Sequence, residues 1–391
     1  MFQLTEPELN QLGAAITTKE IKQEPDLWEQ VYQRFLDKEE ELSSFLNKII
    51  ESADTKVKVI FTGAGTSEYV GNSIWSFLQT YGQREQFLFY SIASTDLVSA
   101  PHYYLYEEDT VLLVSFARSG NSPESIAAVD LTNQLVANCY HLTITCAEEG
   151  ELAKRALADK RHFLLLMPPR SNDAGFAMTG SFTCMMLSAL LIFDKAHTNE
   201  EKLDFIIQMK RMAEDIINRE PEISDLMKNP FDRIVYLGSG SLAGLTQEAQ
   251  LKILELTAGK IATLYDSSMG FRHGPKSFIN EQTVVFGFVN NHTYTRQYDL
   301  DILEEIASDQ IAQSTIAIGQ RKEKNFSGKS VVLNSDFLLP DAYLAFPMIV
   351  FAQTVALLAS IKVNNLPDTP SESGTVNRVV KGVRIYDYLR E

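Results

Sequence analysis

The chain has 391 residues, of which 45% are hydrophobic, and a formal net charge of −16 at pH 7. A chain of this size and composition buries a large apolar core, and its length favours two globular domains. The charge disfavours nucleic acid and anionic membranes as partners, because both repel an acidic surface. An anionic small molecule would therefore have to be held by local hydrogen-bond donors.

The N-terminal sequence "MFQLTEPELNQLG" lacks the basic and apolar regions of a signal peptide. No apolar run is expected to approach the roughly 20 residues that span a bilayer. Cys139, Cys146 and Cys184 form no C-x-x-C pair, so they are expected to be small core residues rather than disulfides or zinc ligands. These features predict a cytoplasmic protein.

The first predicted element is a helical extension over residues 1–50. Apolar residues recur there at helical spacing among charged ones, at Leu27, Val31, Phe35 and Leu42. This pattern predicts an amphipathic helix.

Short apolar runs alternate with helical stretches over residues 51–215. Continuous runs of Val, Ile, Leu and Phe are typical of parallel strands that helices bury on both faces. The five predicted strands lie in "KVKVIFTGAG", "QFLFYSIAS", "TVLLVSFARSG", "YHLTITCA" and "HFLLLMPP".

The same alternation repeats over residues 216–391. Gly63 of "GAGTS" is matched by Gly238 of "GSGSL", 175 positions later (238 − 63). The sequence thus predicts an α/β fold of two doubly wound, flavodoxin-like αβα domains joined by a charged helical stretch over residues 199–229. Ligands of such sheets bind beyond the carboxyl ends of the strands. The second set of strands is predicted in "DRIVYLGSGSLAGL", "KIATLYDSS", "QTVVFGFVNN", "STIAIGQ" and "SVVLNSD".

The loop "GAGTSEYVG" follows the first predicted strand and enters a helix. Gly63 and Gly65 permit a tight turn, and Thr66 and Ser67 place hydroxyls at a helix start, where free N–H groups favour an anion. A G-x-G turn is common in α/β proteins, and this one lacks the third glycine of a dinucleotide fingerprint. The loop alone leaves a plain turn and a phosphate site both open.

The stretch "SFARSGNSPES" follows the third predicted strand. A helix cap explains part of it, with Asn121 or Ser122 as N-cap and Pro123 at the first helical position. The cap does not explain Ser119, Gly120 and the remaining hydroxyls. Because this loop and "GAGTS" are expected at the same end of one sheet, the sequence predicts a phosphate cradle that also caps a helix.

The segment "QEAQLKILELTAGK" predicts an amphipathic helix in the second half. Its apolar stripe is Leu251, Leu254 and Ala258, and a second stripe carries Glu248, Lys252 and Glu255. Lys252 and Glu255 share a face and could point into one cavity. A pair at this spacing is more often a solvated surface pair, so spacing alone leaves both roles open.

The loop "MGFRHGPKSF" holds a histidine, His273, between Arg272 and a Gly-Pro turn, with no apolar face to bury it. The proton affinity of histidine suits proton transfer near neutral pH. A lone loop histidine is more often incidental than catalytic.

Together these motifs resemble a known family. Both halves are similar to sugar isomerase (SIS) domains, the phosphosugar-binding fold also found in the isomerase part of glucosamine-6-phosphate synthase, and the resemblance covers about residues 45–391. The "PRSNDAGFAMTGSFT" link and the "SGTVNRVVKGV" tail resemble the galactosamine-6-phosphate deaminase/isomerase group, often labelled tagatose-6-phosphate ketose/aldose isomerase.

The resemblance implies roles for individual residues. Glu255 matches the carboxylate that moves a proton between C1 and C2, and His273 matches a histidine implicated in ring opening, which reaches the neighbouring subunit's site in related dimers. Lys252 and Lys381 match lysines near the reacting carbons. The residues matched to the sugar phosphate are Gly65, Thr66, Ser67, Arg118, Ser119, Asn121 and Ser122.

Two departures from glucosamine-6-phosphate synthase are visible. Arg118 stands where that enzyme has glutamine, which leaves open whether it contacts phosphate, and the glutaminase domain is absent, so the synthetic direction has no ammonia source. "YDSSMGF" is read as replacing the serine-rich loop in the second half. One sugar phosphate per chain is therefore expected, held by the first domain, with catalytic residues from the second.

The resemblance implies conversion of galactosamine 6-phosphate to tagatose 6-phosphate with release of ammonia, by an oligomer of at least two chains. No metal or cofactor is expected, since aldose–ketose proton transfer needs neither. A non-deaminating isomerase uses the same residues and stays open. A non-catalytic sugar-phosphate sensor also stays open, although the chain has no basic recognition helix and retains Glu255, His273 and Lys381.

Overall fold

The computed structural model describes residues 1–322, 324–374, 376–380 and 382–389. The chain forms two compact units. The β1–β5 unit comprises Leu27–Asp173, Gly180–Lys202 and Val376–Glu391, and the β6–β10 unit comprises Met1–Asp26, Ala174–Thr179 and Leu203–Thr375. The predicted boundaries of the two SIS domains, at residues 51, 215 and 391, stay a prediction.

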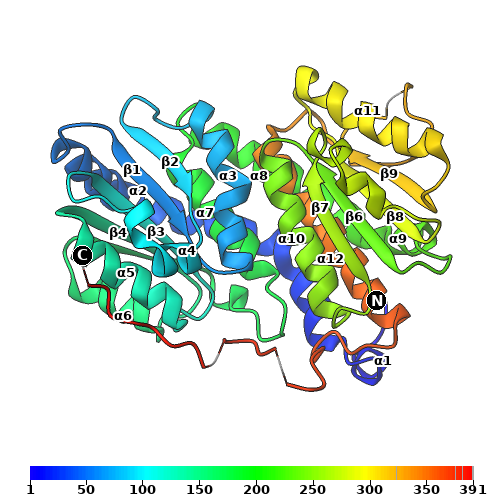
Figure 1. The fold of residues 1–391 in the computed structure, drawn as a ribbon, viewed down its shortest axis with the longest axis horizontal. Coiled ribbons are helices and arrows are strands. Elements are labelled where there is room, and N and C mark those ends of the chain that lie inside the picture. The colour runs from blue at the N-terminus through cyan, green and yellow to red at the C-terminus, as the bar shows by residue number, and fades with distance from the viewer. Residues whose placement is uncertain (323, 375, 381, 390–391) are drawn as a thin grey trace. The chain divides into compact units, whose positions relative to one another are not determined.

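The β1–β5 unit contains a five-stranded parallel sheet in the order β2-β1-β3-β4-β5 (Figure 1). The five strands predicted for the first half are confirmed. Their bounds are β1 (Val57–Thr62), β2 (Phe87–Ser91), β3 (Thr110–Ala117), β4 (Asn138–Thr145) and β5 (His162–Leu166).

Helices cover both faces of this sheet, as the predicted doubly wound fold requires. On one face Phe61, Phe89 and Phe116 lie side by side, and Phe61 and Phe89 each meet Phe193 of α7. On the other face Ile60 and Leu113 pack in one core cluster with residues of α5. The helices of this unit are α3 (Thr66–Tyr81), α4 (Ser94–Ser99), α5 (Pro123–Leu135), α6 (Glu151–Ala158), α7 (Gly180–Phe193), η1 (Pro101–Tyr103) and η2 (Pro169–Ser171).

The predicted N-terminal helices are present as α1 (Glu6–Gln11) and the long α2 (Ala15–Glu51), which contributes to both units. The predicted apolar stripe of α2 is buried within the chain itself. Phe45, further along the same helix, contacts the rings of Tyr140 on β4 and Phe163 on β5. The stripe therefore gives no argument for an interface between subunits.

The β6–β10 unit contains a second five-stranded parallel sheet, in the order β10-β9-β8-β6-β7. Leu300 and Leu303 of α11 pack with Val235 and Val285 on one face of this sheet. On the sheet, Tyr236 stacks on Phe286, and the Phe286 ring also meets Phe351 of α12. The strands are β6 (Arg233–Gly238), β7 (Ala262–Ser267), β8 (Thr283–Phe288), β9 (Ser314–Gly319) and β10 (Lys329–Val332), and all were predicted.

The charged stretch predicted between the two halves is helical, and it forms α8 and α9. The remaining helices are α8 (Asn199–Asn218), α9 (Glu220–Leu226), α10 (Ser241–Leu256), α11 (Thr293–Asp309), α12 (Asp341–Lys362), η3 (Gly270–Arg272) and η4 (Pro275–Phe278).

The expectation that no apolar run approaches membrane-spanning length is wrong for α12. This 22-residue helix is long and apolar enough to cross a bilayer by length and composition. Its most apolar stretch is 89% buried inside the protein, where α12 packs against α10. Its apolar character is thus accounted for by the core of the β6–β10 unit.

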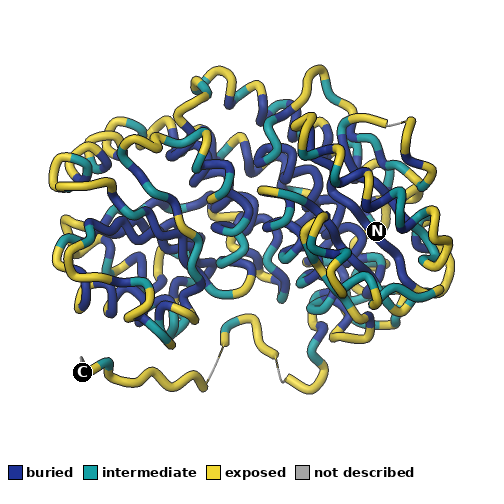
Figure 2. The backbone as a smooth tube through the Cα atoms, turned by 45° about the horizontal axis from the view of Figure 1, so that its top comes forward, coloured by how far each residue is buried: buried dark blue, intermediate teal, exposed yellow. Residues whose placement is uncertain are grey.

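The two sheets have the same topology, as the match of Gly63 with Gly238 predicted. Read from the other edge, the second sheet has the same strand order as the first. Gly65 and Gly240 precede α3 and α10 with the same backbone angles, φ +57° and ψ −128°. After α12 the chain is exposed over most of residues 372–389, which are mainly yellow in Figure 2.

The predicted core cysteines are confirmed: Cys139, Cys146 and Cys184 are buried, and none of them forms a disulfide. Burial raises the pKa of the Cys146 thiol to about 12. A thiol of this kind stays protonated and unreactive at neutral pH.

Two buried histidines face each other across neighbouring strands. His141 on β4 pairs in register with His162 on β5, and their ring centres are 5.1 Å apart. The Nε2 atom of His141 lies 2.8 Å from Asn133 Oδ1, and that of His162 lies 2.7 Å from Thr143 Oγ1. Burial lowers the pKa of His141 to about 4, and burial together with the neighbouring His141 lowers the pKa of His162 to about 3.

We expect this pair to make the protein less stable in mild acid. Below about pH 6.5 the histidines of the unfolded chain take up protons, whereas the folded ones stay neutral until the pH nears 4. The free energy of unfolding should therefore fall by up to about 1.4 kcal/mol per histidine per pH unit. Urea unfolding between pH 7.5 and 5 measures this slope.

The matched variants are His141→Gln/His162→Gln and His102→Gln, since His102 is exposed. The double variant should show a shallower dependence on pH than the native protein, and His102→Gln should leave the slope unchanged. Equal slopes in all three proteins would contradict the role of the pair.

Candidate active site

The "GAGTS" loop connects β1 to α3 as predicted. Gly65 is the N-cap residue, and its positive φ is a conformation that favours glycine. A β-carbon at position 63 would lie 2.6 Å from the backbone carbon of Ser67, so the turn requires a glycine there. Thr66 and Ser67 are buried in the first turn of α3.

The "RSGNS" loop connects β3 to α5. Ser122 is the N-cap residue and Pro123 the first helical residue, as predicted, but the Ser122 side chain makes no capping bond. Its hydroxyl instead donates to Ser125 Oγ at 2.6 Å. Ser119 Oγ accepts the backbone N–H of Asn121 at 3.3 Å. A helix cap therefore explains why Ser122 stands at the start of α5. It does not explain the Ser122 hydroxyl, which makes no capping bond.

Asn121 has a structural partner outside its own loop. Its Oδ1 atom accepts the backbone N–H of Glu151 at 2.9 Å, at the first residue of α6. This contact ties the loop after β3 to the loop after β4. Within the loop after β3, Gly120 has a positive φ.

The two loops lie at the same edge of the sheet, as predicted. β1 and β3 are parallel neighbours, with Thr62 opposite Ser115. The buried hydroxyls of Thr62, Ser94 and Ser115 have no hydrogen-bond partner within the described part of the chain. None of these three residues was among the predicted site residues, although Thr62 and Ser115 end or nearly end two predicted strands.

Arg118 is buried, and its Nη2 atom donates to the backbone oxygen of Arg378 at 2.8 Å. The guanidinium of Arg378 in turn donates from Nε to the backbone oxygen of Asp173 at 3.0 Å. All three residues belong to the β1–β5 unit. Arg118 thus holds the segment that follows α12.

The prediction of which face of α10 is buried is wrong. Leu251 and Leu254 are only half-buried, and Ala258 is exposed beyond the end of the helix, with a positive φ. The charged stripe is the buried one. Its burial is possible because Lys252 pairs with both carboxylates, which the spacing of the residues alone could not reveal.

Lys252, Glu248 and Glu255 form a buried charged cluster on α10. The Lys252 Nζ atom lies 2.6 Å from Glu255 Oε2 and 3.2 Å from Glu248 Oε1. The side chains of Lys252 and Glu248 are 0% exposed, whereas that of Glu255 is 22% exposed. Lys252 and Glu255 are therefore not the solvated surface pair that their spacing usually indicates. Of the three side chains, only that of Glu255 is partly exposed.

The pKa of Lys252 reflects both burial and its partners. Burial by itself would lower it, but the carboxylates of Glu248 and Glu255 outweigh burial and raise it. Lys252 is therefore an ammonium ion at neutral pH and holds the Glu255 carboxylate in place.

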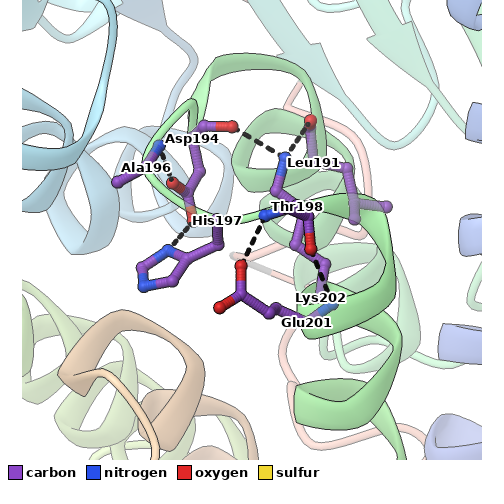
Figure 3. Close-up of polar contacts among 7 residues, drawn as sticks. All are labelled: Leu191, Asp194, Ala196, His197, Thr198, Glu201 and Lys202. Atoms are coloured by element: carbon purple, nitrogen blue, oxygen red, sulfur yellow. Dashed lines mark hydrogen bonds and ion pairs between the residues drawn. The ribbon is translucent and has the colours of Figure 1, made fainter.

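A second buried lysine, in the β1–β5 unit, shows the opposite behaviour. The Lys202 Nζ atom donates to the backbone oxygens of Leu191 and Asp194, at the end of α7 (Figure 3). Its pKa is lowered to about 8 by burial, since its direct partners are carbonyl oxygens rather than two carboxylates. Thr198 and Glu201 cap the start of α8 beside it. This cluster stabilises a helix–helix turn.

His273 is exposed, as predicted, and follows η3. The loop is fixed by its neighbours: Arg272 Nε donates to Glu305 Oε2 at 2.7 Å, and Lys276 pairs with Glu305 and Asp309. Gly274 has a φ of +123°, which favours glycine in the "HGP" turn. The geometry thus presents the imidazole to solvent on an ordered loop.

The predicted site residues fall into two sets. The phosphate candidates lie in the β1–β5 unit, and Glu255, Lys252 and His273 lie in the β6–β10 unit. Within these sets, Lys252 and Glu255 are in direct contact. Lys381 lies outside the described residues.

One correction concerns the second half of the chain. The segment "YDSSMGF" forms the end of β7 and the loop after it. Since β7 corresponds to β2, the segment is not the counterpart of the serine-rich loop after β3. The strand order gives that place to the loop after β8, residues 289–292. This loop contains two asparagines and no serine.

Comparisons with known proteins place this geometry in a family. The SIS domain model matches residues 53–193. The chain is 43% identical to "D-galactosamine-6-phosphate deaminase AgaS" of Escherichia coli, over 95% of this chain and 96% of that one. It is 40% identical to the protein of the same name from Shewanella sp. (strain ANA-3), over 99% and 96%.

A solved structure, tagatose-6-phosphate ketose/aldose isomerase from Escherichia coli, superposes with a TM-score of 0.87 and 39% identity. It covers 96% of this chain and 97% of that one. Since these relatives are 39–43% identical and each covers 95% or more of the chain, the chain belongs to the SIS-domain family and, within it, to the AgaS group.

Proposed function

We propose that this protein is a galactosamine-6-phosphate deaminase/isomerase, which converts galactosamine 6-phosphate to tagatose 6-phosphate and releases ammonia. The observation that carries the proposal is the Glu255 carboxylate, partly exposed and held by a fully buried lysine. A carboxylate fixed in this way is suited to general acid–base catalysis on neighbouring carbons. The names of the aligned AgaS relatives supply the substrate.

The proposed reaction starts with ring opening assisted by His273. In the open-chain imine–enolamine sequence, Glu255 removes the C2 proton and returns it at C1, so that a ketimine forms at C2. Water then adds to the ketimine carbon, the C–N bond breaks, and ammonia leaves the ketose phosphate. The deamination step is therefore a hydrolysis, and the proton transfer is an isomerisation.

The buried position of Lys252 gives it a positioning role in this proposal. Its Nζ atom orients Glu255 through the 2.6 Å contact and neutralises Glu248. Lys381 is proposed to act near the reacting carbons on the basis of the family resemblance alone. The sugar phosphate is assigned to the β1–β5 unit, through Gly65, Thr66, Ser67, Arg118, Ser119, Asn121 and Ser122.

A second candidate function is simple aldose–ketose isomerisation without deamination. The printed name of the Escherichia coli structure, tagatose-6-phosphate ketose/aldose isomerase, favours it. Both reactions use the same proton transfer, so the residues do not separate them.

Incubation with galactosamine 6-phosphate separates the two functions. The deaminase is expected to release one ammonia for each ketose phosphate formed, measured by coupled assays for both products. Ketose formed from a 2-hydroxy hexose phosphate, with no ammonia from any amino sugar phosphate, would favour the isomerase. Binding of sugar phosphates without any turnover would indicate a non-catalytic sugar-phosphate sensor.

We also propose that the protein is at least a dimer and is cytoplasmic. Apolar side chains of the segment after α12 are exposed in the single chain, among them Val376, Tyr386 and Leu389, and a partner subunit would cover such residues. Three cysteines that form no disulfide fit a reducing compartment. Sedimentation should give a mass of two or more chains, and an active monomer would contradict this expectation.

A further inference from the structure

The β6–β10 unit contains a carboxylate that the proposed reaction does not use. Asp299 lies on α11 and is 1% exposed. Its Oδ1 atom accepts the hydroxyls of Ser239 at 2.5 Å and Ser268 at 2.6 Å. Its Oδ2 atom accepts the backbone N–H of Asn290 at 3.0 Å and the Nδ2 group of the same residue at 2.7 Å.

The donors to Asp299 come from the ends of three adjacent strands. Ser239 follows β6, Ser268 follows β7 and Asn290 follows β8, and β6 lies between the other two strands. This carboxyl edge is where doubly wound sheets bind their ligands. Two hydroxyls, a backbone N–H and an amide are also the donors that proteins direct at bound oxyanions.

The corresponding edge of the first sheet keeps one of these donors, and no carboxylate in the described part of the chain accepts its hydrogen bond. The backbone N–H of Ser94 donates to Gly63, and that of Ser268 donates to Gly238, so the two serines correspond. The Ser94 hydroxyl has no partner in the described chain, whereas the Ser268 hydroxyl is bonded to Asp299. Counted from the first residues of α5 and α11, Asp299 corresponds to Val129, which packs in the core.

We propose that the loops after β6, β7 and β8 form a second oxyanion cradle, whose permanent ligand is the carboxylate of Asp299. The carboxylate takes the place that a tetrahedral oxyanion such as phosphate would occupy, and so excludes phosphate from this half of the chain. Charge burial is tolerated because four hydrogen bonds satisfy the carboxylate. Arg296, one helical turn earlier, also donates to the Asn290 backbone oxygen at 3.0 Å.

Removal of this carboxylate should create a requirement for an external anion. Asp299→Ala is expected to lower the unfolding temperature by at least about 5 °C in phosphate-free buffer. Inorganic phosphate or sulfate should restore a large part of that loss. Thermal unfolding at constant ionic strength, with chloride as the reference anion, measures both effects without any sugar substrate.

The matched control is Asp301→Ala, which removes the same charge from an exposed position on α11. All variants are made in the Ser119→Ala/Ser122→Ala background, so that phosphate bound by the loop after β3 does not contribute. Asp301→Ala should have the same unfolding temperature as the Ser119→Ala/Ser122→Ala parent protein, with and without phosphate. If Asp299→Ala folds poorly, its refolding yield in phosphate against chloride gives the same comparison.

Two results would overturn the proposal: Asp299→Ala as stable as Asp301→Ala without phosphate, or a loss of stability that phosphate and sulfate do not reduce. Neither result depends on deaminase activity, because the readout is unfolding. The proposed function and this proposal can therefore fail separately.

Discussion

Glu255→Gln is expected to lower turnover of galactosamine 6-phosphate by roughly 10²–10⁴-fold, while substrate binding is retained. Glutamine keeps the shape of glutamate and accepts the hydrogen bond from Lys252, but it cannot take the proton from C2. Exchange of the C2 proton with deuterated water should disappear together with ammonia release. Steady-state kinetics and nuclear magnetic resonance of the sugar measure the two effects.

Glu248→Gln is the informative control for this variant. Glu248 contacts the same lysine but is fully buried, so it cannot touch a substrate. It should lower stability and leave turnover per folded molecule close to that of the native protein. An equal loss of turnover in both variants would mean that Glu255 acts through the charge cluster, and near-normal turnover of Glu255→Gln would make the pair purely structural.

Ser119→Ala/Ser122→Ala is expected to weaken binding of the sugar phosphate by about 10²- to 10⁴-fold, since each lost hydrogen bond to a charged group contributes about 1.5–3 kcal/mol. The affinity for the same amino sugar without its phosphate should not change. Calorimetric titration with both sugars forms a thermodynamic cycle that isolates the phosphate contribution.

Ser99→Ala is the control, because Ser99 is an exposed serine on α4 of the same unit. It should bind both sugars as the native protein does. Unchanged affinity of the double variant for the sugar phosphate would reduce the "RSGNS" loop to a helix cap.

The sequence predicted the strands well because the central ones, such as β3 and β8, are fully buried runs rich in Val, Leu and Phe. It also predicted the turn glycines, since a β-carbon at Gly63 has no room and Gly65 needs a positive φ. These features are local: a run of side chains or a single backbone angle decides them. The loops at the carboxyl edge of the first sheet followed from the same reasoning.

The features that sequence reasoning missed depend on contacts between distant residues. The buried face of α10 was assigned to its leucines, because the pairing of Lys252 with both Glu248 and Glu255 is visible only in three dimensions. Asp299 belongs to no motif, and its donors are 60, 31 and 9 positions away in the chain. The contact of Arg118 with Arg378 spans 260 positions. The periodicity of apolar residues carries no information about partners so distant in the chain.

The hydroxyls at the carboxyl edges of the two sheets differ in their hydrogen bonding, and this difference has a consequence for amide hydrogen exchange. Ser239 and Ser268 have their acceptor within the chain, so the strand ends of the β6–β10 unit should exchange at the same rate whether or not sugar phosphate is present. Thr62, Ser94 and Ser115 have no acceptor in the described chain, and a ligand bound near them stabilises the folded form by mass action. Substrate should therefore slow exchange at the strand ends of the β1–β5 unit but not at those of the β6–β10 unit, so that one sheet of a duplicated architecture reports ligand occupancy and the other serves as its internal reference.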